Sequence, residues 1–175
     1  MGIGIIVCGC NGSGKSTLGK ELAKKLNYKF IDIEDLYFPL SDTDYTYDSV
    51  RSRDEVESIL IDEVKKYDNF VLAAVKGNYG KELTKLYKYA VFIKVPKEIR
   101  LNRIKNRSFQ KFGNRMLPGG DLYERENHFF NMAASRTQQD VEEWLKSINC
   151  PVICVNGEKD ISENVKFIIN ELFLI

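Results

Sequence analysis

The sequence has no long apolar run, no excess of charge of one sign, and few histidines and cysteines. No stretch approaches the roughly 18 consecutive apolar residues that a membrane-spanning helix needs. The 26 basic and 25 acidic side chains leave a formal net charge of +1, so bulk charge favours neither nucleic acid nor an anionic membrane as a partner. The one histidine, His128, lies beside two phenylalanines in a helical pattern, where a packed or half-exposed position is favoured over catalysis. We therefore expect a soluble globular protein.

The four cysteines lie in two pairs, Cys8 with Cys10 and Cys150 with Cys154. This spacing is compatible with a metal site. We favour four free thiols, because the first pair flanks a glycine of a loop and the second brackets a short apolar strand. Free thiols fit a reducing compartment, and residues 1–7 have neither the positive segment nor the cleavage site of a signal peptide. We expect a cytoplasmic protein.

Apolar runs alternate with helical patterns along the whole chain. Strands are predicted at residues 3–7, 28–33, 70–75, 90–95 and 152–155. Helices are predicted at residues 16–26, 53–67, 81–88, 97–110, 121–148 and 161–172, with Asp121 as the N-cap of the fifth. Residues 41–48, including Tyr45 and Tyr47, and residues 112–120 are predicted loops.

This alternation predicts an α/β fold of three layers, in which a five-stranded parallel sheet carries helices on both faces. The length fits a single domain over residues 1–175, with a short lid at about residues 108–125. Ligands of such sheets bind at the carboxyl ends of the strands, so the residues that follow the strands are the candidates for function.

The segment between the first strand and the first helix matches G-x4-G-K-[ST], the pattern of a phosphate-binding loop. Its glycines let successive backbone N–H groups point at phosphate oxygens, and the helix N-terminus adds a favourable dipole. Lys15 can reach the β- and γ-phosphates, and the Ser16 hydroxyl can bind Mg²⁺. We predict that ATP with Mg²⁺ is the cofactor. The candidate nucleotide contacts in this segment are Gly9, Asn11, Gly12, Ser13, Gly14, Lys15, Ser16 and Thr17.

Three acidic residues, Asp32, Glu34 and Asp35, follow the second strand. Phosphoryl transfer needs a carboxylate near magnesium and often another that orients or deprotonates an acceptor hydroxyl. The third strand ends without an acid, so we assign Asp32 to magnesium and Glu34 or Asp35 to the acceptor. The alternative is a solvated loop in which one acid caps a helix.

Arginines are concentrated in the second half of the chain. Arg100, Arg103 and Arg107 share one face of the predicted helix at residues 97–110. Further arginines follow within or after the glycine-bearing loop: Arg115, Arg125 and Arg136. A mobile lid rich in arginine can bring positive charge to the transferring phosphoryl group and exclude water. The alternative is an ordinary solvated helix face.

The residues VPKE at 95–98, NRI at 102–104 and Arg107 resemble the lid entry of the adenylate kinase family of nucleoside monophosphate kinases. The resemblance implies that Arg103 stacks on the adenine of ATP and that Arg107 contacts the transferring phosphate. The segment VNGEK at 155–159 is similar to the base-binding loop of that family, which makes Lys159 a candidate nucleotide contact.

The acceptor half of the chain departs from that family. It lacks the acceptor-site arginine after strand two and the DGFPR run after strand three, and carries DIED at 32–35 and KGNYG at 76–80 instead. The acidic pattern resembles shikimate kinase and related small-metabolite kinases, which implies one acid near magnesium and one at the acceptor hydroxyl. Arg51 and Arg53 are candidates for an anionic group on the acceptor.

These observations predict an ATP- and Mg²⁺-dependent phosphotransferase that acts on a small metabolite, either a hydroxyl acceptor or a nucleoside or nucleotide. The alternative is a P-loop ATPase or nucleotide-dependent switch without a small-molecule acceptor. We expect a monomer or homodimer with no nucleic-acid or membrane partner. The sequence does not identify the acceptor.

Overall fold

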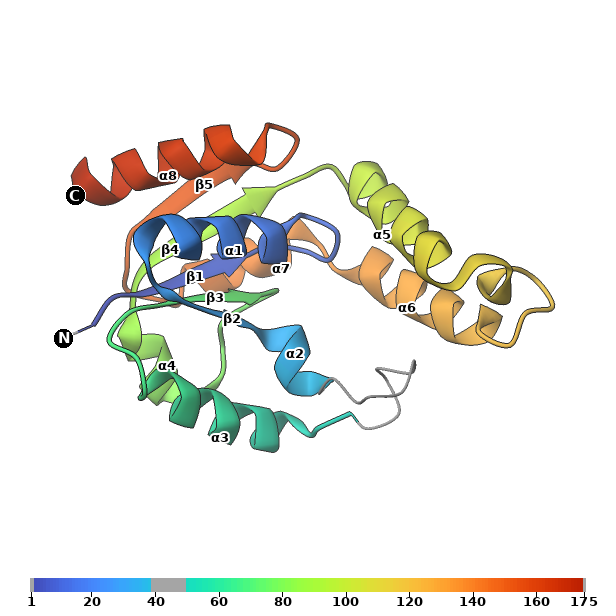
Figure 1. The fold of residues 1–175 in the computed structure, drawn as a ribbon, viewed down its shortest axis with the longest axis horizontal. Coiled ribbons are helices and arrows are strands. Elements are labelled where there is room, and N and C mark those ends of the chain that lie inside the picture. Colours follow the sequence, from blue (N-terminus) through green and yellow to red (C-terminus); the bar gives the residue numbers. More distant parts are fainter. Residues whose placement is uncertain (1, 39–49, 175) are drawn as a thin grey trace.

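The computed structural model of the chain describes residues 2–38 and 50–174. At its centre lies a sheet of five parallel strands in the order β2-β3-β1-β4-β5 (Figure 1). The strands are β1 (Gly4–Cys8), β2 (Lys29–Asp32), β3 (Phe70–Ala74), β4 (Tyr87–Lys94) and β5 (Val152–Asn156). The predicted α/β fold is confirmed. The loop predicted at residues 41–48, with Tyr45 and Tyr47, lies outside the described residues.

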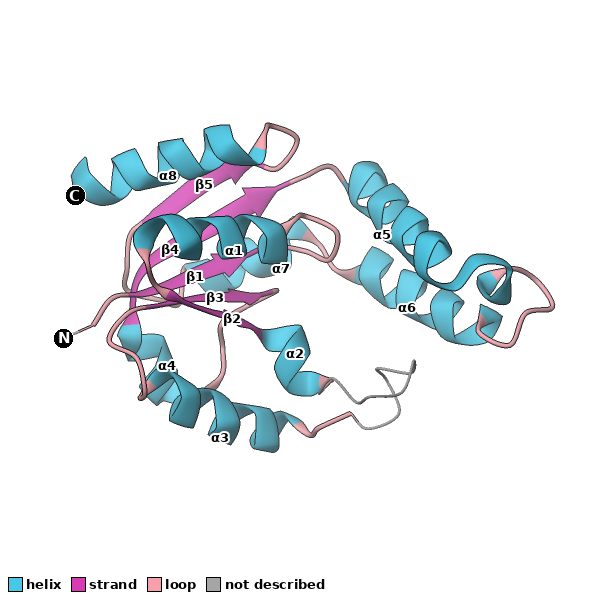
Figure 2. Ribbon diagram, in the orientation of Figure 1, coloured by secondary structure: helices cyan, strands magenta, loops and turns pink. Residues whose placement is uncertain are grey.

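Helices cover both faces of the sheet (Figure 2). They are α1 (Lys15–Leu26), α2 (Ile33–Tyr37), α3 (Arg53–Val64), α4 (Gly80–Leu86), α5 (Lys97–Phe112), α6 (Tyr123–Ser135), α7 (Gln138–Leu145) and α8 (Ile161–Leu174), with a 3-10 helix, η1 (Gly113–Met116). Helices α1 and α8 pack on one face, and α2, α3, α4 and α7 contribute to the core on the other.

The central strand β1 is buried on both faces. Ile6 and Cys8 belong to the apolar cluster under α3 and α7, whereas Ile5 and Val7 belong to the cluster under α1 and α8. This follows from the two-residue period of a strand, and it explains why β1 reads as a continuous apolar run. The sheet thereby fixes the end of β1, where the phosphate-loop sequence begins.

The helix predicted at residues 121–148 is two helices, α6 and α7. At the break, the Thr137 hydroxyl accepts a hydrogen bond from the Asp140 N–H at 3.1 Å, and the Asp140 carboxylate accepts one from the Thr137 N–H at 2.9 Å. This capping box starts a new helix. Asp121 is not the N-cap of the helix, since it precedes α6 and pairs with Arg115.

Helix α2 was not predicted, and it forms within the acidic cluster. Asp32 has an extended backbone at the end of β2, and its carboxylate accepts a hydrogen bond from the Glu34 N–H at 3.0 Å. This bond satisfies one of the free N–H groups at the start of a helix. Asp32 therefore has a structural role, which is the N-cap named as the alternative for this cluster.

Helices α5 and α6 form a hairpin that projects beyond the carboxyl ends of the strands (Figure 1). The residues predicted as a lid, 108–125, lie toward the tip of this α5–α6 hairpin. Among the described residues, no helix is both long and apolar enough to cross a membrane.

Candidate active site

The phosphate loop connects β1 to α1 in the conformation that its glycines permit. Gly12 and Gly14 have φ values of 79° and 94°, in the left-handed region that other residues rarely adopt. Gly14 is the N-cap of α1 and offers no side chain to the free N–H groups of the first turn. These groups are therefore available to an anion, which the positive end of the helix dipole also favours.

Lys15 is folded back into this loop. Its side chain is 8% exposed, and its ammonium donates a hydrogen bond to the Cys10 carbonyl at 3.1 Å. Burial lowers the pKa of Lys15, while the negative charges of Glu34 and then Asp32 act in the opposite direction. The two acids after β2 therefore lie close enough to act electrostatically on the phosphate-loop lysine.

The other predicted loop contacts differ in exposure. Asn11 and Ser13 are buried, and the Ser13 hydroxyl has no hydrogen-bond partner among the described residues. Ser16 and Thr17 are exposed on the first turn of α1. A buried hydroxyl without a partner costs free energy unless a ligand or water satisfies it. Three hydroxyls thus lie at the loop and the first turn of α1. The Ser13 hydroxyl is buried without a partner among the described residues, and the Ser16 and Thr17 hydroxyls face solvent.

The acidic cluster follows β2, which is separated from β1 and the phosphate loop by β3. Asp32 is half-buried at the end of β2, whereas Glu34 and Asp35 are exposed on α2. Partial burial raises the pKa of Asp35, and the charge of Asp32 adds to the effect. Of the three carboxylates, Glu34 has the largest effect on the pKa of Lys15. The sequence did not distinguish Glu34 from Asp35.

The donors in this region suit Mg²⁺ when phosphate oxygens complete its shell. Mg²⁺ prefers oxygen ligands and keeps several waters, so one hydroxyl and one carboxylate are a sufficient protein contribution. Ser16 offers an exposed hydroxyl, and Asp32 uses one carboxylate oxygen for its cap. No group of three metal-ligating side chains occurs in the part of the chain that the structure describes.

A pocket of about 280 Å³ lies on the opposite side of the phosphate loop. Ser13, Gly14 and Thr17 line it together with Arg103 and the loop after β5, including Lys159. The structure thus brings together five predicted nucleotide contacts from three distant segments. Next to a phosphate loop, a pocket of this kind can hold a nucleoside.

The loop that closes this pocket is tightly built. Arg103 donates a hydrogen bond to the Gly157 carbonyl at 3.1 Å. A Cβ at Gly157 would lie 2.5 Å from a methyl of Val95, so only glycine lets the loop come this close to the sheet. Lys159 forms an ion pair with Glu163 on α8. Arg103 and Lys159 therefore line the pocket together with the loop that contains Gly157.

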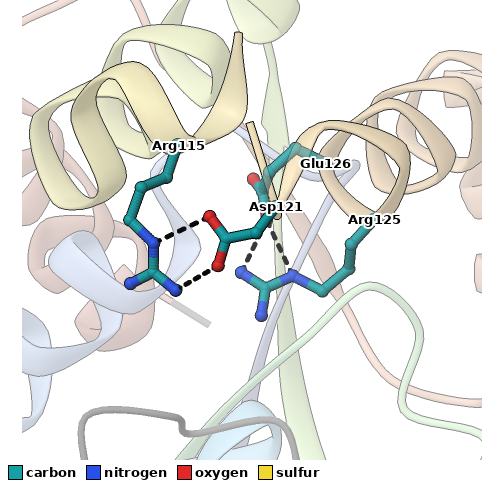
Figure 3. Close-up of polar contacts among 4 residues, drawn as sticks. All are labelled: Arg115, Asp121, Arg125 and Glu126. Atoms are coloured by element: carbon teal, nitrogen blue, oxygen red, sulfur yellow. Dashed lines mark hydrogen bonds and ion pairs between the residues drawn. The ribbon is translucent and has the colours of Figure 1, made fainter. Parts of the chain in front are cut away.

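Three further arginines of the hairpin differ in their surroundings: two form ion pairs and one is exposed. Arg115 donates two hydrogen bonds to the Asp121 carboxylate at 3.0 and 2.6 Å, and Arg125 donates to the buried carboxylate of Glu126 at 3.0 Å (Figure 3). Arg107 is exposed, and its guanidinium has no partner within residues 2–38 and 50–174. The structure therefore keeps Arg107, but not Arg115 or Arg125, available for a ligand.

The spacing predicted that Arg100, Arg103 and Arg107 share one face of the helix. The structure differs, because Arg100 does not lie on the solvent-facing surface with Arg103 and Arg107. It is 2% exposed and donates a hydrogen bond to the Asn11 carbonyl at 3.1 Å. Arg136, at the break between α6 and α7, donates to the side-chain oxygen of Asn11 at 2.6 Å. Sequence reasoning assigned neither arginine to the phosphate loop. One signal was present, since Arg100 precedes the buried Ile104 by one helical turn.

The candidate arginines of the acceptor side bind backbone carbonyls. Arg51 donates to the Leu36 carbonyl at 2.8 Å, and Arg53 donates to the Asn78 carbonyl while it lies 5.2 Å from the ring centre of Tyr79. These contacts join α2, the start of α3 and the loop after β3. They form a frame next to Glu34 rather than two free anion-binding groups.

The cysteine thiols and His128 are not among the groups that we assign to a ligand. All four cysteines are free thiols, as predicted, and burial raises the pKa of Cys8 to about 12. His128 is exposed on α6, so of the packed and half-exposed positions that we favoured for it, the packed one is wrong.

Comparisons with known proteins agree with the geometry of the site. The profile of the AAA domain family matches residues 5–116, which is more than half of the chain. A shikimate kinase of Clostridium botulinum (strain Alaska E43 / Type E3) is 30% identical over 82% of this chain and 95% of its own length. The chain belongs to the P-loop small-molecule kinase family. The uncharacterized protein YqaC of Bacillus subtilis (strain 168) is another relative of this P-loop kinase, 27% identical over 96% of each chain.

Solved structures support the fold of this P-loop kinase. Deoxyadenosine kinase from M. mycoides with bound dATP superposes with a TM-score of 0.58 at 17% identity, covering 96% of this chain and 98% of its own. A gluconokinase from Sinorhizobium meliloti 1021 gives a TM-score of 0.51 at 16% identity, covering 94% and 87%. Family membership supports nucleotide-dependent kinase activity and leaves the acceptor open.

Proposed function

We propose that this protein transfers the γ-phosphoryl group of ATP, with Mg²⁺, to a hydroxyl group of a small metabolite. The observation that carries the proposal is the placement of Glu34 and Asp32 near enough to the phosphate-loop Lys15 for their negative charges to raise its pKa against the effect of burial. A hydroxyl acceptor needs a carboxylate beside the transferring phosphate, whereas a phosphate acceptor would be repelled by one. The curated relatives include shikimate kinases, which supports a small-metabolite acceptor.

Each residue of the site has a role in this reaction. The N–H groups at the start of α1 and the Lys15 ammonium hold the β- and γ-phosphates. Arg103 and Lys159 hold the nucleoside in the pocket beside Gly157. Mg²⁺, bound by Ser16 and Asp32, would neutralise charge on the phosphate oxygens.

The transfer itself requires a base and a movable cation. Glu34 orients the acceptor hydroxyl and accepts its proton, with Asp35 beside it on α2. Arg107 meets the charge on the transferring group when the α5–α6 hairpin closes, because positive charge placed there lowers the barrier. Closure also excludes water, which would otherwise compete with the acceptor.

The alternative, a P-loop ATPase or switch, has less support. Such proteins commonly hold Mg²⁺ with an acid on the strand beside the phosphate loop. Here β1 lies between β3 and β4, and neither β3, which reads FVLAA, nor β4, which reads YKYAVFIK, contains an acid. The acids lie instead at the end of β2 and on α2, where an acceptor can reach them.

ATP turnover with and without a pooled library of hydroxyl-bearing metabolites tests the proposal. We expect slow hydrolysis of ATP alone and a large increase with one class of acceptor. Lys15→Ala is the control, and it should abolish the increase because no other side chain supplies its charge. Hydrolysis as fast without acceptors as with them would favour the ATPase alternative. Unchanged turnover in Lys15→Ala would contradict the site.

A further inference from the structure

Arg100 is the largest fully buried side chain of the described residues. Its two terminal nitrogens donate to the carbonyls of Asn11 and Arg136 at 3.1 and 3.4 Å, and its Nε has no partner within residues 2–38 and 50–174. No carboxylate in those residues forms an ion pair with it. The guanidinium therefore lies in the interior with only neutral partners.

This environment is unfavourable for a group that cannot lose its proton. An arginine stays protonated in proteins, and a buried charge normally requires a counter-charge as well as hydrogen bonds. The Asn11 carbonyl belongs to the phosphate loop, so a phosphate held in that loop would bring negative charge into the neighbourhood of Arg100. The buried positive charge is thus placed where a polyphosphate could compensate it.

Arg100 and Arg136 reach Asn11 from the two ends of the α5–α6 hairpin. Arg100 lies in the first turn of α5, where the hairpin leaves the sheet, and Arg136 follows α6, where it returns. The guanidinium of Arg136 donates to the Asn11 side chain at 2.6 Å. Contact with the loop is close, because a Cβ at Gly12 would lie 2.4 Å from the Arg100 carbonyl oxygen.

We propose that Arg100 and Arg136 are positioning residues that join both ends of the hairpin to Asn11, so that a polyphosphate in the loop stabilises the hairpin and the loop together. Neither arginine needs to touch the transferring phosphate, since both act through Asn11. The bound phosphates supply the negative charge that the buried Arg100 lacks. This inference rests on the proposed function, because it requires a polyphosphate in the loop.

The test measures binding of inorganic tripolyphosphate by calorimetry and hydrogen exchange of α5 and α6, with no acceptor present. Arg100→Lys keeps the positive charge but cannot donate to both carbonyls in the way that the planar guanidinium does. We expect it to weaken tripolyphosphate binding about tenfold. In the wild type, tripolyphosphate should slow exchange in both helices, and in Arg100→Lys this protection should be largely lost. Lys97→Met removes an exposed charge from the same turn of α5, and it should behave as the wild type.

Arg136→Gln provides a second variant that does not disturb the core, because Arg136 is only half-buried. It should also weaken tripolyphosphate binding and reduce the protection of α6. A merely structural role would lower the melting temperature and leave the tripolyphosphate-dependent protection unchanged. That result in Arg136→Gln, or in a folded Arg100→Lys, would overturn the inference. If the wild type bound no tripolyphosphate, both the inference and the proposed function would fail. Binding without turnover of any acceptor would overturn the function alone.

Discussion

At the scale of single residues, Arg103 and Arg107 lie one turn apart on α5 in different surroundings. Arg103 donates to the Gly157 carbonyl beside the pocket at the phosphate loop, whereas the guanidinium of Arg107 has no partner within the described residues. A group that acts only on the transition state lowers kcat, and a group that holds the ground state changes KM. The two arginines should therefore differ in which kinetic constant they control.

Steady-state kinetics of Arg103→Ala and Arg107→Ala test this difference. Arg107→Ala should lower kcat about 100-fold with little change in KM for ATP. Arg103→Ala should raise KM for ATP about tenfold and affect kcat less. Lys105→Ala, at an exposed position between them, is the matched control. Small and equal effects in both arginine variants would mean that this side of α5 is ordinary solvated surface.

The three acids at the end of β2 and on α2 should also differ in their effects on activity when each carboxylate is replaced by an amide. Asp32→Asn keeps a side chain that caps helices well, so the fold should persist while the Mg²⁺ concentration for half-maximal activity rises. Glu34→Gln should lose transfer but still bind ATP, since its charge acts on the acceptor proton. Asp35→Asn should have the smaller effect on transfer. Calorimetry with ATP and a transfer assay over a range of Mg²⁺ concentrations measure these changes.

These amide variants also distinguish the acceptor classes. If the acceptor is a nucleoside monophosphate, Glu34→Gln should leave activity unchanged or raise it, because a carboxylate repels the acceptor phosphate. Wild-type behaviour in all three variants would mean that the acidic cluster is ordinary surface charge with no part in the reaction. The acceptor site would then have to lie elsewhere.

At the scale of elements, the junction of α6 and α7 connects stability to the site. The capping box of Thr137 and Asp140 starts α7 and sets the position of Arg136. Thr137→Ala should lower the free energy of unfolding by about 1 kcal/mol, the usual effect of losing an N-cap. It should also weaken ATP binding, because Arg136 is then less well placed. Thr137→Ser keeps the hydroxyl and is the control in urea unfolding. Equal losses in both variants would contradict a role for the cap.

At the scale of the whole molecule, nucleotide binding should connect the sheet with the hairpin. Ligand at about 100 times its Kd stabilises a protein by about 2.7 kcal/mol, which is a rise of about 5–10 °C in Tm for a chain of this size. We expect this rise with ATP and Mg²⁺ in a thermal melt, together with slower hydrogen exchange in α5 and α6. Lys15→Ala should lose both effects. A rise in Tm without protection of the hairpin would mean that the hairpin does not close on ATP.

Part of the site followed from local sequence. The phosphate loop is recognisable because its glycines, lysine and serine occupy adjacent positions and need no distant partner. Arg103 and Lys159, both predicted nucleotide contacts, line the pocket at the phosphate loop, since each follows a strand whose carboxyl end faces the site. Arg100 and Arg136 were not assigned to it, because their roles depend on how α5 and the end of α6 pack against Asn11. The spacing of Arg100 to the buried Ile104 was the only local sign, and it does not show which groups the arginine contacts.

The sequence by itself determined the five strands, the α/β class and the phosphate loop, because strand periodicity and turn chemistry act over a few residues. Only the tertiary structure decided which strand lies beside the loop, which acid acts on Lys15, and which arginines are paired, exposed or buried. Those properties depend on strand order and helix packing between residues more than 100 positions apart, such as Cys10 and Arg136, which are 126 positions apart. Long-range packing and the electrostatics of burial are not encoded in any short segment.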